Sequence, residues 1–513
     1  MGITMRHWAW AAAPLALALL TTGCDSTSGA PGARGAEPTA APTTSGGRAV
    51  AQVCAKPAAG PAEPPAGAVT VDPAVVGDLA AKTMSNPPHT TFWLRPGKHR
   101  LDPDRYAQVV PKEGNRYLGA PGAVLDGGKK SQYAFSGTAR DVTIRYLTVE
   151  RFVAPLDEGV VNHDSADGWV IEHATIQNNS GAGLMAGARQ QVRASCLRDN
   201  GQYGMNAYKG SGRITGLVVE DNEIVGNNTG DWERRRKGCG CTGGIKFWAV
   251  DGADVRGNWV HDNRGTGLWA DTNNNDFRIE NNVIEANDGA ALIYEISYNA
   301  VIRNNTIRRN NWVEGRAAAE GGDNFPFATV YLSESGGEPR IKARTDKIEI
   351  YRNLLEDNWS GITLWENADR FCNSPANTSS GDCTPLVKNT DRCAKPAIAK
   401  PPLYDDCRWK TQRVDIHDNR FVLDVSVVKC TEKCDRMAVL SNYGTYPDWS
   451  PYKGEKVADA ITLKQHNRWH DNVYLGPWKF VAHDPSRVLT FQEWQGTPYQ
   501  QDTGSTFRAR AGG

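Results

Sequence analysis

The chain has 513 residues, of which 40% are hydrophobic, and its 58 basic and 58 acidic residues give no net charge. A chain of this length is too long to fold around one ordinary compact core, unless the core is extended by repeated units. The charge balance provides no electrostatic basis for binding nucleic acid or an anionic membrane surface.

Residues 1–24 are predicted to be an export signal. Arg6 supplies a positive charge, and Trp8–Leu20 is an apolar run of about 13 residues, which is too short to span a bilayer. The segment ends in LTTGC, which resembles the lipoprotein box of bacteria, although Thr21 stands where Leu is usual. The resemblance implies that Cys24 is lipidated and anchors the protein at the cell surface. An ordinary signal peptide followed by a secreted protein is the alternative.

The next boundary is compositional. Residues 25–68 are rich in Ala, Gly, Pro, Ser and Thr, cannot bury a core, and are expected to form a flexible, disordered tether. The folded domain is predicted to span residues 69–513. A short helix within Val69–Lys82 and the segment Trp478–Thr506 are expected to cap its two ends.

Within this domain, an Asn-x4-Asn unit repeats at a nearly fixed interval. Asn258, Asn282 and Asn305 begin three such units at steps of 24 and 23 residues, and the apolar residues between them alternate as in strands. Coils of this length with Asn at the bends resemble the right-handed parallel β-helix of the pectate-lyase-like superfamily. The predicted fold is therefore all-β, a parallel β-helix solenoid of about a dozen coils and on the order of 55 Å long.

The Asn residues form one column of the repeat and are interpreted as structural. Asn tolerates left-handed backbone geometry and can bond to neighbouring bends. The expected members are Asn178, Asn200, Asn222, Asn258, Asn282, Asn305, Asn353, Asn419 and Asn467.

A second column appears when the apolar strands are aligned, and it points outward. Alternate strand residues share a face, which places aromatic residues beside carboxylates on one side of the rod. Aromatic rings stack on sugar rings, so we expect a saccharide-binding face. The predicted substrate-binding residues are Tyr208, Trp248, Trp269, Tyr331, Glu334, Trp365 and Glu366.

Long insertions flank these strands on both sides. Residues 228–242 and 311–327 precede the strand, whereas residues 336–345 and 369–411 follow it. Insertions in a solenoid map to loops on one face, often the binding face. The spacing therefore predicts a groove with two walls.

Asp271 and Glu295 are the predicted catalytic carboxylates, with Lys246 one coil earlier. On successive coils their carboxyl groups would lie roughly 5 Å apart and repel by about 3 kcal/mol, which favours one acid and one base. About 5 Å is also the separation in retaining glycosidases. Glycoside hydrolysis is therefore the leading hypothesis, and the residues leave open which carboxylate plays which role.

Two alternatives remain open. Resemblance to β-helix polysaccharide lyases implies a lyase or epimerase with Lys246 as base and Ca²⁺ held by oxygen ligands from Asp271, Asn273, Asn275, Asp276 and Glu295. Otherwise no metal or cofactor is expected. The third possibility is a surface glycan-binding protein without catalysis. The expected partner in every case is a polysaccharide, and the chain is expected to act as a monomer.

The cysteines are the last signal. Apart from Cys24, ten remain, and an even number in an exported chain predicts disulfides. The close pairs Cys372/Cys383, Cys393/Cys407 and Cys430/Cys434 are candidates. Zinc is the rival interpretation for Cys239-Gly-Cys241, although no His cluster lies at ligand spacing nearby.

Overall fold

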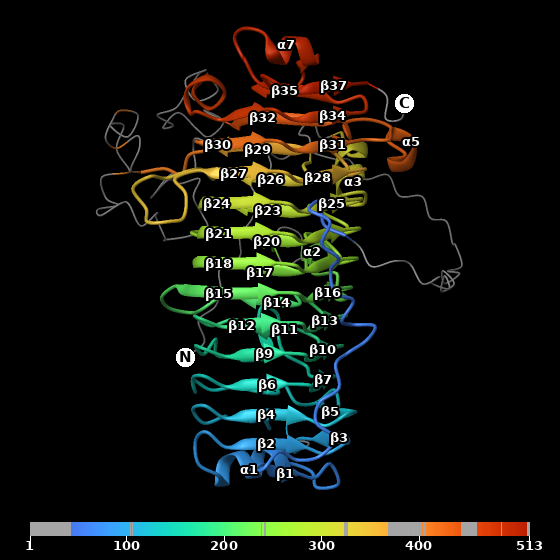
Figure 1. Cartoon of the computed structure of the whole chain (residues 1–513), viewed down its shortest axis with the longest axis vertical. Helices are drawn as coiled ribbons and strands as arrows, with labels where there is room; N and C mark the ends of the chain where they lie inside the picture. Colours follow the sequence, from blue (N-terminus) through green and yellow to red (C-terminus); the bar gives the residue numbers. More distant parts are fainter. Residues whose placement is uncertain are drawn as a thin grey trace, which may run out of the picture.

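The computed structural model describes residues 43–509 with several gaps. The short gaps are residues 103, 105, 237–238, 241–242, 323–326 and 484, and a longer one is 443–458. Of residues 368–406, only 393, 400 and 403 are described. The strands stack along one axis into a rod (Figure 1). Two sheets of thirteen strands and one of eleven form its sides. The predicted all-β, right-handed parallel β-helix is confirmed.

The chain visits the three sheets in turn, and neighbours within each sheet are parallel except β35 and β36. Sheet 1 consists of β1 (Val69–Val71), β2 (Thr91–Leu94), β4 (Arg116–Gly119), β6 (Thr143–Arg145), β9 (Val170–Glu172), β12 (Gln191–Arg193), β15 (Ile214–Glu220), β18 (Val250–Arg256), β21 (Asn275–Glu280), β24 (Tyr298–Arg303), β27 (Ile348–Tyr351), β30 (Val414–His417) and β33 (Arg468–His470). Sheet 2 consists of β3 (Gly97–Arg100), β5 (Ala123–Asp126), β7 (Thr148–Glu150), β10 (Thr175–Gln177), β13 (Cys196–Arg198), β16 (Glu223–Val225), β19 (Trp259–His261), β22 (Val283–Glu285), β25 (Thr306–Arg308), β28 (Leu354–Glu356), β31 (Arg420–Val422), β34 (Val473–Leu475) and β37 (Thr506–Arg508). Sheet 3 consists of β8 (Gly159–Val161), β11 (Ala182–Met185), β14 (Met205–Ala207), β17 (Ile245–Phe247), β20 (Leu268–Ala270), β23 (Leu292–Glu295), β26 (Val330–Ser333), β29 (Ile362–Asn367), β32 (Arg436–Asn442), β35 (Lys479–His483) and β36 (Val488–Leu489).

The helices lie at the ends of the rod and in the insertions: α1 (Asp78–Ser85), α2 (Trp232–Arg235), α3 (Glu314–Glu320), α5 (Val425–Val428), α7 (Phe491–Gln495) and a π-helical turn at Ala460–Lys464. Helix α1 lies below the first coil and α7 above the last (Figure 1). Trp494 of α7 is fully buried and stacks on Phe480 with ring centroids 5.3 Å apart, which covers the apolar end of the core.

Two asparagine ladders hold the bends, one between sheets 1 and 2 and one between sheets 2 and 3. In each ladder the side-chain amide donates to the amide oxygen of the next coil; Asn258 donates to Asn282 at 3.0 Å and Asn263 to Asn287 at 2.9 Å. The first ladder runs through Asn222, Asn258, Asn282, Asn305, Asn353, Asn419 and Asn472. The second runs through Asn179, Asn200, Asn227, Asn263, Asn287, Asn310 and Asn358.

Three members of the expected column differ. Asn200 belongs to the second ladder. Asn179 takes the ladder position expected for Asn178, which instead adopts a φ of 54° at the bend. Asn467 donates to the carbonyls of Thr411 and Ile461 rather than to a stacked Asn, so that Asn472 ends the first ladder. At Asn178 and Asn179, a shift of one residue decides which side-chain amide joins the ladder.

Residues 43–68 form a strap along the outside of the coils. Cys54 is disulfide-bonded to Cys196 of β13, and its backbone N–H donates to Glu223 at 2.9 Å. Ser45 donates to the Arg352 carbonyl at 2.7 Å, beside a much later coil. Figure 1 shows the strap in blue, running beside sheet 2 from the base to the level of β25. Residues 43–68 thus differ from the flexible tether expected over residues 25–68, because a disulfide, hydrogen bonds to the coils and the buried Val50 hold them on the rod; residues 25–42 lie outside the described part.

The disulfides include two of the expected close pairs, Cys393–Cys407 and Cys430–Cys434. Cys239 is also disulfide-bonded, which opposes the zinc interpretation. The pair Cys372/Cys383 and the lipidation candidate Cys24 lie outside the described residues. Such disulfides persist in oxidising compartments, which indicates export. Among the described residues, no helix combines the length and apolarity needed to cross a bilayer.

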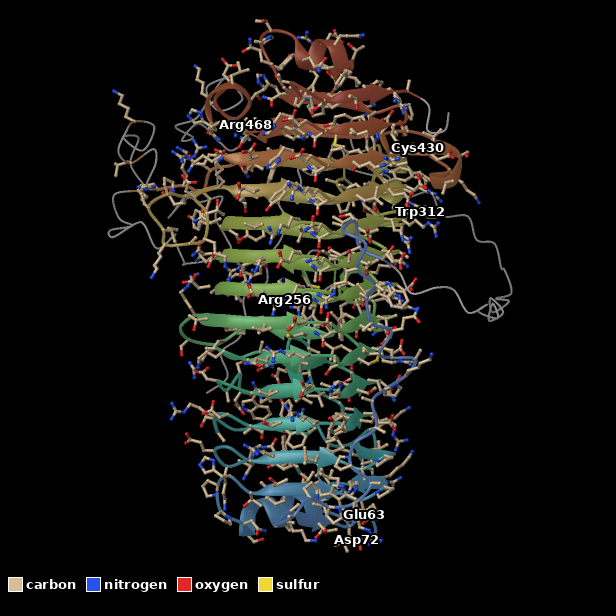
Figure 2. All side chains as sticks on the ribbon, in the orientation of Figure 1. Glu63, Asp72, Arg256, Trp312, Cys430 and Arg468 are labelled. Carbon is tan, nitrogen blue, oxygen red and sulfur yellow. A yellow bond between two sulfur atoms is a disulfide. The ribbon has the colours of Figure 1, made fainter. Side chains whose placement is uncertain are left out.

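A charge ladder follows the outer face of sheet 1. On seven successive strands the in-register residues alternate in sign: Arg145, Glu172, Arg193, Glu220, Arg256, Glu280 and Arg303. Arg256 lies 2.8 Å from Glu220, and Arg303 lies 2.7 Å from Glu280. The ladder then continues as a ring stack of Tyr351, His417 and His470. Figure 2 labels Arg256 within this ladder and Arg468 near its far end.

Candidate functional site

The outer face of sheet 3 is enclosed by insertions of the chain. The segment with α2 lies between β16 and β17, and the segment with α3 lies between β25 and β26, so both precede a strand of sheet 3 as expected. Asp271 and Glu295 are each 5% exposed, and Trp269 is 6% exposed. The face therefore points outward from the core, but these three side chains have little access to solvent.

The structure brings together the three predicted catalytic residues and Trp269. The Lys246 ammonium lies 3.1 Å from an Asp271 carboxylate oxygen and 4.3 Å from the centre of the Trp269 ring. The Trp269 indole N–H donates to Glu295 at 3.3 Å. Because β17, β20 and β23 pair in register, Lys246 lies beside Trp269, and Asp271 and Glu295 follow on adjacent coils. Trp269 thus links the ammonium on one side to the second carboxylate on the other.

Three further hydrogen bonds were not anticipated from the sequence. The Thr272 hydroxyl donates to Asp271 at 3.0 Å. The Gly240 carbonyl accepts hydrogen bonds from Lys246 at 3.0 Å and from the Tyr203 hydroxyl at 2.8 Å. A backbone carbonyl carries no sequence signal, and Tyr203 lies in a bend away from the aligned strands.

An apolar strip continues up the face beyond Glu295. Ile293 and Tyr331 are in register on β23 and β26, and they cluster with Trp269 and two alanines. Tyr331 stacks on Trp365 with ring centroids 6.3 Å apart and planes 28° apart. Three of the predicted substrate-binding residues, Trp269, Tyr331 and Trp365, therefore form one aromatic surface.

Tyr208 and Trp248 form a separate pair below the carboxylates. Their rings meet edge to face with centroids 6.5 Å apart, and both are half-buried. Trp248 follows β17, the strand that carries Lys246, and Tyr208 follows β14 one coil earlier. They extend the outer face toward the base of the rod.

Glu334 and Glu366 do not lie on this face. Both are fully buried. Glu366 pairs with the buried Arg408 and accepts hydrogen bonds from the Thr411 N–H at 2.9 Å and from Gln465 at 2.8 Å. Glu366 follows the outward Trp365 within β29, so strand alternation turns it inward, whereas Glu334 lies just after β26 with a φ of 45° and accepts the Asn367 N–H at 3.1 Å. Their expected role in substrate binding is therefore corrected to a structural one.

The predicted calcium ligands do not converge. Asp276 accepts the backbone N–H of Arg344 at 2.8 Å, and Asn275 donates to Asp251 of sheet 1 at 2.8 Å. Both belong to β21, around the bend from Asp271. Within the described residues no group of three or more His, Cys, Asp or Glu is placed to hold a metal. These residues do not fit the calcium site that the lyase resemblance implies.

Acidic residues gather where the α2 and α3 segments, which both precede strands of sheet 3, approach each other. Burial first, and then the charges of Asp288, Glu233 and Asp231, raise the pKa of Glu314 to about 7, although Arg234 opposes this. Burial likewise raises the pKa of Asp288. Glu233 and Asp231 belong to the α2 segment and Glu314 to α3, so ionisation of Glu314 adds a like charge between these two segments.

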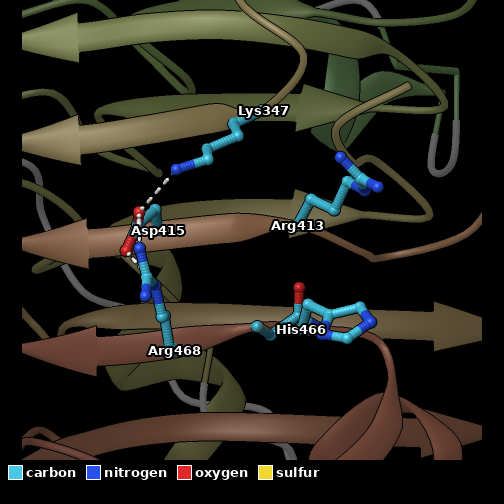
Figure 3. A pocket seen from close by; sticks show the side chains of 6 residues that line it. Lys347, Arg413, Asp415, His466 and Arg468 are labelled. Atoms are coloured by element: carbon cyan, nitrogen blue, oxygen red, sulfur yellow. Dashed lines mark hydrogen bonds and ion pairs between the residues drawn. The ribbon is translucent and has the colours of Figure 1, made fainter. Parts of the chain in front are cut away.

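A hollow of about 370 Å³ lies on the outer face of sheet 1, away from these residues. It is lined by Lys347, Arg413, Asp415, His466, Asn467 and Arg468. Asp415 accepts two hydrogen bonds from Arg468, at 2.9 and 2.7 Å, and one from Lys347 at 3.3 Å (Figure 3). Although burial opposes it, this hydrogen bonding lowers the pKa of Asp415 to about 2. The cations therefore already neutralise the one carboxylate in the hollow.

Comparisons with known proteins agree with the fold. A family model described as the right handed beta helix region matches residues 158–330. No curated protein matches the chain. Similar solved structures include the A-module of the mannuronan C-5 epimerase AlgE4 of Azotobacter vinelandii, with 12% identity, a TM-score of 0.37, and coverage of 69% of this chain and 92% of that one.

Two further structures have comparable similarity. The periplasmic alginate epimerase AlgG has 13% identity, a TM-score of 0.35, and coverage of 73% of this chain and 78% of its own. The catalytic unit of a GH87 alpha-1,3-glucanase from Streptomyces thermodiastaticus has 14% identity, a TM-score of 0.35, and coverage of 63% and 65%. By fold, the chain is a right-handed parallel β-helix protein.

Proposed function

We propose that the protein is an exported enzyme that hydrolyses glycosidic bonds of a polysaccharide on the outer face of sheet 3. The observation that carries this proposal is the placement of Asp271 and Glu295 on adjacent, in-register coils, joined through Lys246 and Trp269. Adjacent strands are about 4.8 Å apart. Two carboxylates at about that distance match the separation of a retaining glycosidase pair.

The contacts suggest a role for each carboxylate. Asp271 has the Lys246 ammonium and the Thr272 hydroxyl beside it, and both stabilise a negative charge. We assign Asp271 as the nucleophile and Glu295 as the acid that protonates the leaving oxygen and later activates water. Lys246 places a positive charge 3.1 Å from Asp271 and is assigned no proton transfer in this proposal.

The aromatic residues supply the binding surface in this proposal. Trp269, Tyr331 and Trp365 offer ring faces on which the apolar faces of sugars can stack, next to the carboxylates. Tyr208 and Trp248 would contact sugar units further along a chain that lies parallel to the rod axis. An enclosed site also strengthens the electrostatic contacts, because water is excluded.

The location of the enzyme follows from the disulfides and the N-terminal sequence. Described disulfides such as Cys54–Cys196 indicate an oxidising compartment. We propose that Cys24 carries a lipid and that this anchor is the only contact with a membrane, the enzyme otherwise acting as a monomer. Labelling with a radioactive fatty acid, lost in a Cys24→Ala variant, is expected for this anchor.

The test of the activity uses a panel of plant, algal and cell-wall polysaccharides with products identified by mass. Asp271→Asn and Glu295→Gln are each expected to lower kcat by roughly 10²–10⁴-fold. Glu220→Gln is the matched control, because Glu220 is an ion-paired carboxylate on the outer face of a different sheet. Its activity is expected to equal that of the wild type.

Other outcomes identify the alternatives. If both variants keep the wild-type rate, hydrolysis by this pair is wrong. A product that absorbs in the near ultraviolet, formed only without chelator, would indicate a Ca²⁺-dependent lyase. Binding of a glycan without any product would indicate a surface glycan-binding protein.

A further inference from the structure

The contact between Gly240 and Lys246 is held from below by a buried tyrosine. The Gly240 carbonyl accepts one hydrogen bond from the Lys246 ammonium at 3.0 Å and one from the Tyr203 hydroxyl at 2.8 Å. Tyr203 is 1% exposed. Burial first, and then the charges of Asp157 and Asp271, raise its pKa well above the usual value, so the phenol stays protonated and donates.

Gly240 itself is fixed on its other side and leaves little space for a side chain. Its N–H donates to Glu233 of α2 at 3.0 Å, and its neighbour Cys239 is disulfide-bonded. Its φ is +61°, and an added Cβ would lie 3.1 Å from the Trp269 ring and 3.2 Å from the Lys246 nitrogen. The carbonyl is therefore held in place by groups that take no part in binding a substrate.

Three contacts fix the position of the Lys246 ammonium. An ammonium has three N–H donors, and Lys246 contacts the Asp271 carboxylate, the Gly240 carbonyl and the face of the Trp269 ring. A lysine held in this way is poorly suited to take a proton from a substrate. It is well suited to hold a charge at a fixed position beside Asp271.

We propose that Tyr203 is a positioning residue, which fixes the Gly240 carbonyl and through it the Lys246 ammonium between Trp269 and Asp271. This inference rests on the proposed function, since the position of Lys246 matters for turnover only if Asp271 reacts. Tyr203 touches no substrate. It acts through Gly240, from the bend that precedes β14.

The experiment compares Tyr203→Phe with the wild type in two measurements. The first is the rate of reductive dimethylation of Lys246 without substrate, followed by mass spectrometry. Loss of the hydrogen bond, worth about a factor of five, is expected to raise this rate roughly fivefold. The second is turnover of the polysaccharide identified by the panel, where kcat is expected to fall by about five- to tenfold with KM unchanged.

Tyr294→Phe is the matched control. Tyr294 is also a fully buried tyrosine, and its hydroxyl donates to the Tyr298 carbonyl at 2.7 Å rather than to Gly240. It is expected to lose similar stability but to leave the Lys246 labelling rate unchanged. Gly240→Ala is the second variant, since its added Cβ disturbs the same contact from the side of Trp269 and Lys246 if Tyr203→Phe fails to fold. It is expected to raise labelling as well.

The outcomes separate this inference from the proposed function. An unchanged labelling rate in both Tyr203→Phe and Gly240→Ala would overturn the positioning role. Higher turnover in Tyr203→Phe would also overturn it, because Gly240 would then block the face rather than support it. If the wild type cleaves no polysaccharide, the proposed function fails, while the labelling rates still decide how Lys246 is held.

Discussion

The outer faces of sheets 1 and 3 are built on the same coils but distribute charge in opposite ways. On sheet 1 the charge ladder alternates Arg and Glu from Arg145 to Arg303, so each side chain has an opposite charge on the next coil. On sheet 3 two carboxylates, Asp271 and Glu295, follow each other on adjacent coils. The Lys246 ammonium lies beside Asp271.

The difference shows what each face is suited for. Opposite charges in register stabilise a stack of strands, whereas like charges in register destabilise it. The contact between the α2 and α3 segments repeats the pattern of sheet 3, since Glu314 lies near Asp288, Glu233 and Asp231. Repulsion between like charges concentrated around one face is typical of functional sites, where reactive groups lower the folding stability.

The largest expected effect concerns Glu314. Its folded-state pKa of about 7 exceeds the ordinary value of 4.5, so its contribution to stability is present below pH 4.5 and is lost as the pH rises through 7. Glu314→Gln removes this charge and is expected to stabilise the protein by about 3 kcal/mol at pH 8.5. Guanidinium unfolding of the variant and the wild type at pH 8.5 and at pH 4 measures this difference in the free energy of unfolding. An equal gain at pH 4 would contradict the explanation.

A smaller effect of opposite sign is expected at the end of sheet 1. Asp415 has a pKa of about 2 against an ordinary 3.8, so its contribution is present above pH 3.8 and is lost as the pH falls through 2. Asp415→Asn is expected to cost about 2 kcal/mol at pH 7. The same unfolding measurement at about pH 1, below both pKa values, should show almost no difference between variant and wild type; a persistent gap would point to packing instead.

The smallest effect compares one carboxylate from each face. Glu220→Gln removes the partner of Arg193 and Arg256 and is expected to destabilise by about 0.5–1 kcal/mol. Glu295→Gln relieves repulsion with Asp271 and keeps an acceptor for the Trp269 N–H, so it is expected to be neutral or to stabilise by a similar amount. Urea midpoints at pH 7 test this. Two changes of the same sign would remove the contrast between the faces.

The fold could be predicted because a solenoid repeats local rules. The step from Asn258 to Asn282 and Asn305 marked the bends, and strand alternation correctly placed Leu268 and Ala270 in the core with Trp269 outside it. These features depend on residues close in the sequence and on the next coil. They therefore follow from spacing alone.

The parts of the site that were missed depend on contacts that spacing does not encode. Tyr203 reaches Gly240 across 37 positions, and the covering of Asp271 arises from an insertion whose path has no repeat. Glu366 was placed outward because its neighbour Trp365 was, although a shift of one residue reverses the side of a strand. Residues 43–68 have the composition of a linker, and a single disulfide at Cys54 is part of what holds them on the rod.

The strap also determines an order of events during synthesis. Ser45 and its partner Arg352 are 307 positions apart. At roughly 5–20 residues per second, Ser45 waits roughly 15–60 s before its partner exists. The Cys54–Cys196 disulfide, which spans 142 positions, becomes possible earlier. Residues near the beginning of the chain are thus among the last to dock, and their docking marks a rod whose coils are already stacked.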